Sequence, residues 1–195
     1  MKSAFGRIVK PWSAFRRDKR GSLLVETAFV IPVLITLTLG GVEIARYALL
    51  NQKLDRLAMT TSDMVSQGDT ISVPVLDAIL SATGTIMNPF PFGGDGVVIV
   101  TSVSKTGAAA VTVDWQRSGG GTMTGMVSQL GAPGQNATLP AGFTVKAGEN
   151  AIFSETFYQF TPMFVSSVVD PSIVYHRAVF RPRQVPLKTL CPAAC

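Results

Sequence analysis

The residues best placed for chemistry are a glycine, a serine and a glutamate near the start of the chain. Gly21 and Ser22 follow a basic stretch, and Glu26 is the first of two charges in the apolar run Leu23–Ala45. A carboxylate in an apolar helix is unfavourable by up to ~2.5–3.5 kcal/mol at a membrane centre, and by less near the helix end. If the chain were cut after Gly21, the new amine of Ser22 could pair with the Glu26 of the same or a neighbouring subunit. The alternative is a glutamate that reaches the membrane interface without a partner.

The other reactive side chains form no catalytic pattern. His176 is the only histidine and lies in a strand-like segment, so we expect a structural role. Glu149 and Glu155 are six residues apart, a spacing too common to indicate a glycosidase. The glycine run 119–121 lacks the Gly-Lys-Ser/Thr of a phosphate loop. The sequence therefore predicts no enzyme, no catalytic residue, no cofactor and no small-molecule substrate.

Both cysteines, Cys191 and Cys195, lie near the C-terminus. Two cysteines and one histidine are too few for a four-ligand zinc site, so we predict no metal. In an oxidising compartment the two cysteines could close a small disulfide loop, and otherwise they are two free thiols.

The positive charge of the chain is local. Residues 1–20 hold seven of the 17 Lys and Arg residues but only one acidic residue, Asp18, which leaves 10 basic and 11 acidic residues elsewhere. A net charge of +5 therefore does not indicate a phosphate-binding surface, and we predict no nucleic-acid partner.

Residues 22–45 are long and apolar enough to span a membrane. At ~1.5 Å per residue, the 23 residues Leu23–Ala45 form a helix roughly 35 Å long, against a hydrocarbon core of ~30 Å. A secretory signal has a shorter apolar region and a small-residue cleavage site, which Gly40-Gly41-Val42-Glu43 does not provide. The basic residues before the span predict a cytoplasmic N-terminus and a C-terminal domain outside the cytoplasm.

The N-terminal pattern resembles that of the TadE-like pseudopilins of tight-adherence (Flp-type) pilus systems. Such proteins have basic residues, a glycine, four small or apolar residues and a glutamate, then an apolar segment with a proline and a Gly-x-x-Glu near its far end. Gly21, Glu26, Pro32 and Gly40-Gly41-Val42-Glu43 match these positions, whereas Thr27 stands where an aromatic residue is usual. The resemblance implies cleavage between Gly21 and Ser22 by a prepilin peptidase, and assembly guided by Glu26.

The helix is expected to continue beyond the membrane. Apolar and small residues recur on one face at helical spacing, namely Leu50, Leu54, Leu57, Ala58, Thr61, Met64 and Val65. Glu43 and Arg46 are spaced to pair near the outer interface, for a few tenths of a kcal/mol if exposed. Pro32 should weaken the helix near Ala28. The proline is then either a functional hinge or simply tolerated in a lipid-embedded helix. A short helix is expected at 75–80.

The rest of the chain predicts strands. Residues 97–103 are apolar on both faces, as in a central strand, and 97–116 read as a hairpin. Residues 152–160 and 172–180 are further strand candidates, with the aromatic residues Phe157, Tyr158, Phe160 and Phe164 expected in the sheet core. The turn-rich segment from Asn88 should hold little regular structure, and 118–142 should be an exposed loop with a possible short helix at 123–130.

These elements predict a pilin-like α+β protein in four parts, in which a long N-terminal helix precedes an antiparallel β-sheet. They are a basic cytoplasmic leader at 1–21, a transmembrane helix at 22–45, an amphipathic extension at 46–68 and a periplasmic α+β domain at 69–195. The resemblance implies a minor pilin or pseudopilin of the inner membrane, with a prepilin peptidase and other pilins as partners and a role in pilus assembly and surface adhesion. The alternative is an uncleaved, single-pass anchored periplasmic binding or sensor protein.

Overall fold

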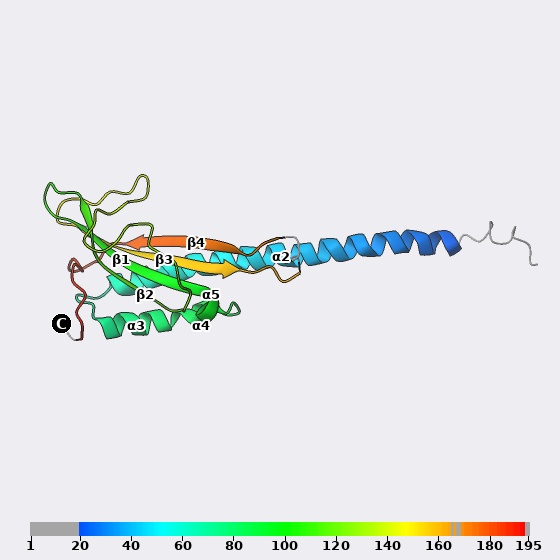
Figure 1. Cartoon of the computed structure of the whole chain (residues 1–195), viewed down its shortest axis with the longest axis horizontal. Helices are drawn as coiled ribbons and strands as arrows, with labels where there is room; N and C mark the ends of the chain where they lie inside the picture. Colours follow the sequence, from blue (N-terminus) through cyan, green and yellow to red (C-terminus); the bar gives the residue numbers. More distant parts are fainter. Residues whose placement is uncertain (1–19, 165, 167–168, 194–195) are drawn as a thin grey trace, which may run out of the picture.

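The chain forms one long helix that leads into a sheet packed on its second half (Figure 1). This computed structural model describes residues 20–164, 166 and 169–193. Helix α2 spans Arg20–Ser66, with Pro32 inside it, and its 47 residues extend about 70 Å at the rise of an α-helix. Every residue from Gly21 to Leu39 is exposed, because this half projects beyond the rest of the protein.

The second half of α2 buries the predicted apolar face. Leu50, Leu54 and Leu57 are fully buried, and Ala58, Thr61 and Val65 lie in the same stripe. Met64 was predicted on this face, and that prediction is wrong, because its side chain is 47% exposed. Consecutive helical residues point about 100° apart, so the turn that buries Val65 carries Met64 to the edge of the stripe.

Four antiparallel strands form the sheet, as the sequence predicts for an α+β fold. The strands are β1 (Gly96–Lys105), β2 (Val111–Gly119), β3 (Asn150–Phe160) and β4 (Ser172–Phe180), in the order β2-β1-β3-β4. β1 is a central strand, and nine of its ten residues are buried, in agreement with its two apolar faces. Helix α2 packs against β3 and β4, where the hydroxyl of Ser62 donates to the carbonyl oxygen of Ala178 at 3.4 Å.

Three short helices follow α2. Helix α3 (Val73–Ser81) confirms the predicted helix after Pro74, and α4 (Thr83–Met87) continues on from it. The segment after Asn88 holds little regular structure, as expected, because its helix α5 (Phe92–Asp95) is a single turn. Close packing explains why a glycine is needed in the run 119–121, because a Cβ at Gly121 would lie 2.1 Å from the carbonyl oxygen of Gly96.

The coil between β2 and β3 covers the face of the sheet opposite the helices. The loop predicted at 118–142 is irregular and mostly exposed or half-buried, as expected, but Leu130 within it is fully buried, and Val145 further along the coil is only 5% exposed. No helix forms at 123–130. Met123 and Met126 instead pack against a cluster of sheet residues, namely Val97, Ile99 and Phe157. The domain therefore has three layers, which are helices, sheet and ordered coil.

The segment 183–191 closes the domain after β4. The carbonyl oxygen of Leu187 accepts hydrogen bonds from the Trp115 indole and the Ser102 hydroxyl, both at 2.8 Å. The Leu187 amide donates to the Asn150 side chain at 3.1 Å. Further on, the amide of Cys191 donates to Ile71 at 3.0 Å, so this segment ties the sheet to the start of α3.

Candidate functional site

The predicted processing residues lie in the first turns of α2. Gly21 and Ser22 are exposed, and an added Cβ at Gly21 would have no neighbour within 4 Å. Glu26 follows one turn after Ser22, and its side chain is exposed as well. Residues 1–19, which hold nearly all of the basic leader, lie outside the described residues. This arrangement leaves the peptide bond after Gly21 and the Glu26 carboxylate open to other proteins.

Polar side chains in the apolar half of α2 bond within their own helix. The hydroxyl of Thr27 donates to the carbonyl oxygen of Leu23 at 2.7 Å, and Thr36 donates to that of Pro32 at 2.8 Å. A backbone carbonyl thus replaces water as the partner of each hydroxyl, so Thr27 is compatible with a lipid-facing position.

Within the described residues, one helix is long and apolar enough to cross a membrane. It extends over Gly21–Ser66, and its most apolar window has a mean hydropathy of 2.1 with none of it buried inside the protein. These properties support a single-pass anchor near the N-terminus.

A carboxylate ties α2 to the domain formed by the chain after α2 (the outer domain), at the point where the exposed half of the helix ends. One oxygen of Glu43 accepts the backbone N–H groups of Met163 and Phe164, at 2.9 and 3.0 Å. Its other oxygen accepts from Arg46 at 2.9 Å, as the sequence predicts. The pair is more enclosed than a surface ion pair, because Glu43 is only 7% exposed. Glu43 therefore fixes the connection between β3 and β4 to the helix.

Aromatic packing surrounds this tie. The rings of Tyr47 and Phe160 meet edge to face with centroids 5.3 Å apart, and the Arg46 guanidinium carbon lies 5.7 Å from the Phe160 centroid. Phe157, Tyr158 and Phe160 are buried, as predicted for the core. Phe164 was expected in the core as well, but it is 44% exposed because it lies in the connection beyond the end of β3.

His176 has the structural setting that the sequence predicts. Its Nε2 atom lies 2.9 Å from the side-chain oxygen of Asn51, and its Nδ1 atom lies 4.0 Å from Asp55. Both partners belong to α2, so His176 joins β4 to the helix.

Glu155 is the most enclosed carboxylate of the outer domain. It is fully buried and accepts hydrogen bonds from the Gln129 amide at 3.0 Å, the Tyr175 hydroxyl at 2.8 Å and the Ser128 hydroxyl. Burial, followed by the nearby Glu155 charge, raises the pKa of Tyr175 above its ordinary value. Because Ser128 and Gln129 belong to the coil, the carboxylate fastens the coil to the sheet. The sequence gives one sign of this role, a lone charge inside an apolar strand.

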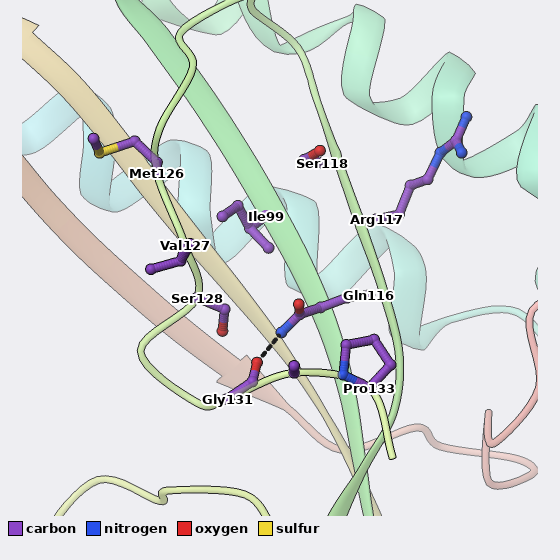
Figure 2. A pocket seen from close by; sticks show the side chains of 10 residues that line it. Ile99, Gln116, Arg117, Ser118, Met126, Val127, Ser128, Gly131 and Pro133 are labelled. Atoms are coloured by element: carbon purple, nitrogen blue, oxygen red, sulfur yellow. Dashed lines mark hydrogen bonds between the residues drawn. The ribbon is translucent and has the colours of Figure 1, made fainter. Parts of the chain in front are cut away.

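A cavity of about 590 Å³ lies beside Ser128, one of the Glu155 partners, between β2 and the coil (Figure 2). The Gln116 amide donates across it to the carbonyl oxygen of Gly131 at 2.8 Å. Arg117 points away toward the helices, where it forms two hydrogen bonds with Asp77, at 2.9 and 2.7 Å. This contact lowers the pKa of Asp77. The lining is otherwise apolar or neutral, so the cavity offers no free charge for a charged ligand.

A second polar cluster lies where β1, β2 and β3 meet. Asp114 accepts from Ser104 at 2.8 Å and from Ser102 and Asn150 at 3.3 Å, while burial raises its pKa. Across the described part of the chain, no group of three or more His, Cys, Asp or Glu side chains could hold a metal ion. Cys191 lies beside Ser72, but Cys195 lies outside the described residues, so the disulfide stays a prediction.

The comparisons with known proteins yield one match. The family model described as TadE-like protein matches residues 21–62, which run from the exposed start of α2 to the packed part of the same helix. No curated protein and no solved structure matches the chain. Residues 21–62 of this chain are thus a TadE-like segment, as the N-terminal sequence pattern predicted.

Proposed function

We propose that this protein is a minor pilin or pseudopilin of a tight-adherence pilus, anchored in the inner membrane with its outer domain in the periplasm. The observation that carries the proposal is the match over residues 21–62, which coincides with an exposed apolar helix and the packed half that follows it. A prepilin peptidase would cut between Gly21 and Ser22. The role is non-enzymatic and consists of assembly with other pilins, in support of surface adhesion.

The accessibility of the first helical turns supports processing. Gly21 is exposed, and a Cβ added there would have no neighbour within 4 Å, so a bound peptidase would have no packed side chain to displace. Cleavage would remove the basic leader and place a new amine at Ser22, one turn before Glu26. That amine could form an ion pair with the Glu26 of a neighbouring subunit, which offsets the cost of a carboxylate in lipid.

Mass spectrometry of the protein from a host with a matching prepilin peptidase tests the cleavage. The expected mature chain begins at Ser22, and a Gly21→Leu variant should keep its leader. A wild-type chain that keeps residues 1–21 in that host would contradict the proposal and favour the uncleaved anchored protein.

A second experiment tests the assembly role. Glu26→Ala should still enter the membrane, because the substitution removes a charge from the apolar helix, but its incorporation with other pilins should fail. Glu26→Asp keeps a carboxylate and is the matched control. Normal pilus assembly by Glu26→Ala would refute the role assigned to this residue.

A further inference from the structure

Apolar side chains stay exposed where α2 enters the outer domain. Ile44 is 73% and Tyr47 45% exposed on the helix, while Met163 is 60% and Val169 49% exposed on the connection between β3 and β4. These two segments border a groove of about 470 Å³. The groove is lined mainly by apolar residues, namely Gly40, Ile44, Tyr47, Phe160, Pro162 and Val169. In water, such a patch would leave a continuous apolar surface unburied.

The position of the groove along the helix indicates what covers it. A ~30 Å hydrocarbon core takes about 20 helical residues, so a span that begins at Leu23 ends near Val42. Glu43, Ile44 and Tyr47 then lie within about 8 Å of the outer boundary of the core, at ~1.5 Å per residue. The groove thus opens at the level where acyl chains meet headgroups.

The tie at Glu43 fixes the connection at the same level. The N–H groups of Met163 and Phe164 are both bonded to this carboxylate, so these side chains cannot drift away from the helix without breaking two hydrogen bonds. Strand β3 runs toward the end of the domain from which the apolar half of α2 projects, so the connection that follows β3 lies at that end of the sheet (Figure 1). A tyrosine at this level, here Tyr47, is typical of a membrane interface.

We propose that the connection between β3 and β4 is a second membrane contact. Met163, Phe164 and Val169 lie among the lipids of the outer leaflet, and the groove beside Ile44 and Tyr47 holds part of an acyl chain. The occupant is lipid because the exposed apolar residues Ile44 and Tyr47 follow within about two turns of the fully exposed apolar half of α2. The inference rests on the proposed single-pass topology, and it gives the outer domain a fixed orientation on the bilayer.

Fluorescence quenching of the full chain in nanodiscs of brominated phosphatidylcholine tests this contact. Phe164→Trp and Met163→Trp each place an indole in the proposed contact, at positions exposed enough to accept it. Leu34→Trp reports insertion of the span. Ala108→Trp is the control, because it lies in the turn after β1, at the opposite end of the sheet from the connection.

Each variant is compared with the parent protein, which already contains Trp12 and Trp115. We expect Phe164→Trp and Met163→Trp to lose fluorescence most strongly with bromine near the headgroup end of the acyl chain. Leu34→Trp should respond most to bromine near the methyl end, and Ala108→Trp should match the parent.

The outcomes separate this inference from the proposed function. Quenching of Leu34→Trp without quenching at 163 or 164 would overturn the second contact and leave the anchor intact. Loss of quenching at all three positions would contradict the anchor itself. A third outcome is that Phe164→Trp is not quenched at several copies per nanodisc but is quenched at one copy per nanodisc. In that case a second copy of the protein occupies the groove, and the lipid proposal is wrong.

Discussion

Removing the Glu43 carboxylate should release the connection between β3 and β4 from the helix. In Glu43→Ala the N–H groups of Met163 and Phe164 lose their shared acceptor. A hydrogen bond to a charged group contributes about 1.5–3 kcal/mol, but water can replace part of it because the connection is partly exposed. We therefore expect the local opening of this connection to become easier by about 2–3 kcal/mol for the two bonds together.

Amide hydrogen exchange of the full chain in nanodiscs measures this change. Since about 1.4 kcal/mol corresponds to a factor of ten, exchange at Met163 and Phe164 should accelerate about 30- to 150-fold. Glu43→Gln keeps a neutral acceptor and should give a smaller increase. Glu26→Ala, which removes an exposed carboxylate from the same helix, should leave these amides unchanged. Unchanged exchange in Glu43→Ala would refute the tie.

Three further substitutions test the outer domain. The hydrogen bond from Arg117 lowers the pKa of Asp77 below its ordinary value of 3.8, so this contact stabilises the fold above pH 3.8 and is lost as the pH falls below it. Asp77→Asn should therefore show a smaller drop in Tm on acidification than the parent. Tyr175→Phe removes a donor to Glu155 and should cost about 1–2 kcal/mol in urea unfolding at neutral pH. Since the pKa of Tyr175 is raised above 10.0, the parent loses this stabilisation above pH 10, and the variant should lose less there. Thr101→Val replaces a buried hydroxyl that has no hydrogen-bond partner and should stabilise the fold by about 1 kcal/mol.

Urea unfolding is read from the fluorescence of Trp115, which is only 7% exposed in the fold. Equal acid sensitivity in Asp77→Asn and the parent would show that the contact with Arg117 adds no pH-dependent stability. An unchanged free energy of unfolding in Tyr175→Phe would show that the hydrogen bond from Tyr175 to Glu155 adds no stability. A destabilised Thr101→Val would mean that the Thr101 hydroxyl has a partner.

The regular elements could be predicted because their residues repeat with a period. Leu50, Leu54 and Leu57 recur at helical spacing, and the β-branched run 97–103 has no polar face, so both patterns give the element and its burial. The apolar half of α2 could be predicted from its length and composition, whereas the roles of Gly21, Glu26 and Pro32 rest on a resemblance and stay predictions.

The coil layer and the tie could not be predicted in this way. Leu130 and Met126 are separated by irregular backbone, so their burial leaves no period in the sequence. Glu43 is visible as a carboxylate at the end of an apolar run, but its partners at 163 and 164 are backbone groups more than a hundred residues away. Backbone donors carry no sequence signature, so only the fold reveals that contact.

The closing segment 183–191 has a consequence for the order in which the protein is made. Trp115, Asn150 and the start of α3 all find hydrogen-bond partners in this segment, the last part of the described chain to be synthesised. Until Leu187 is available, the Trp115 indole and the side-chain oxygen of Asn150 lack these partners, so the core around them stays incomplete. The domain after α2 therefore completes its core only after residues 183–191 have been synthesised, long after the helix on which its sheet packs.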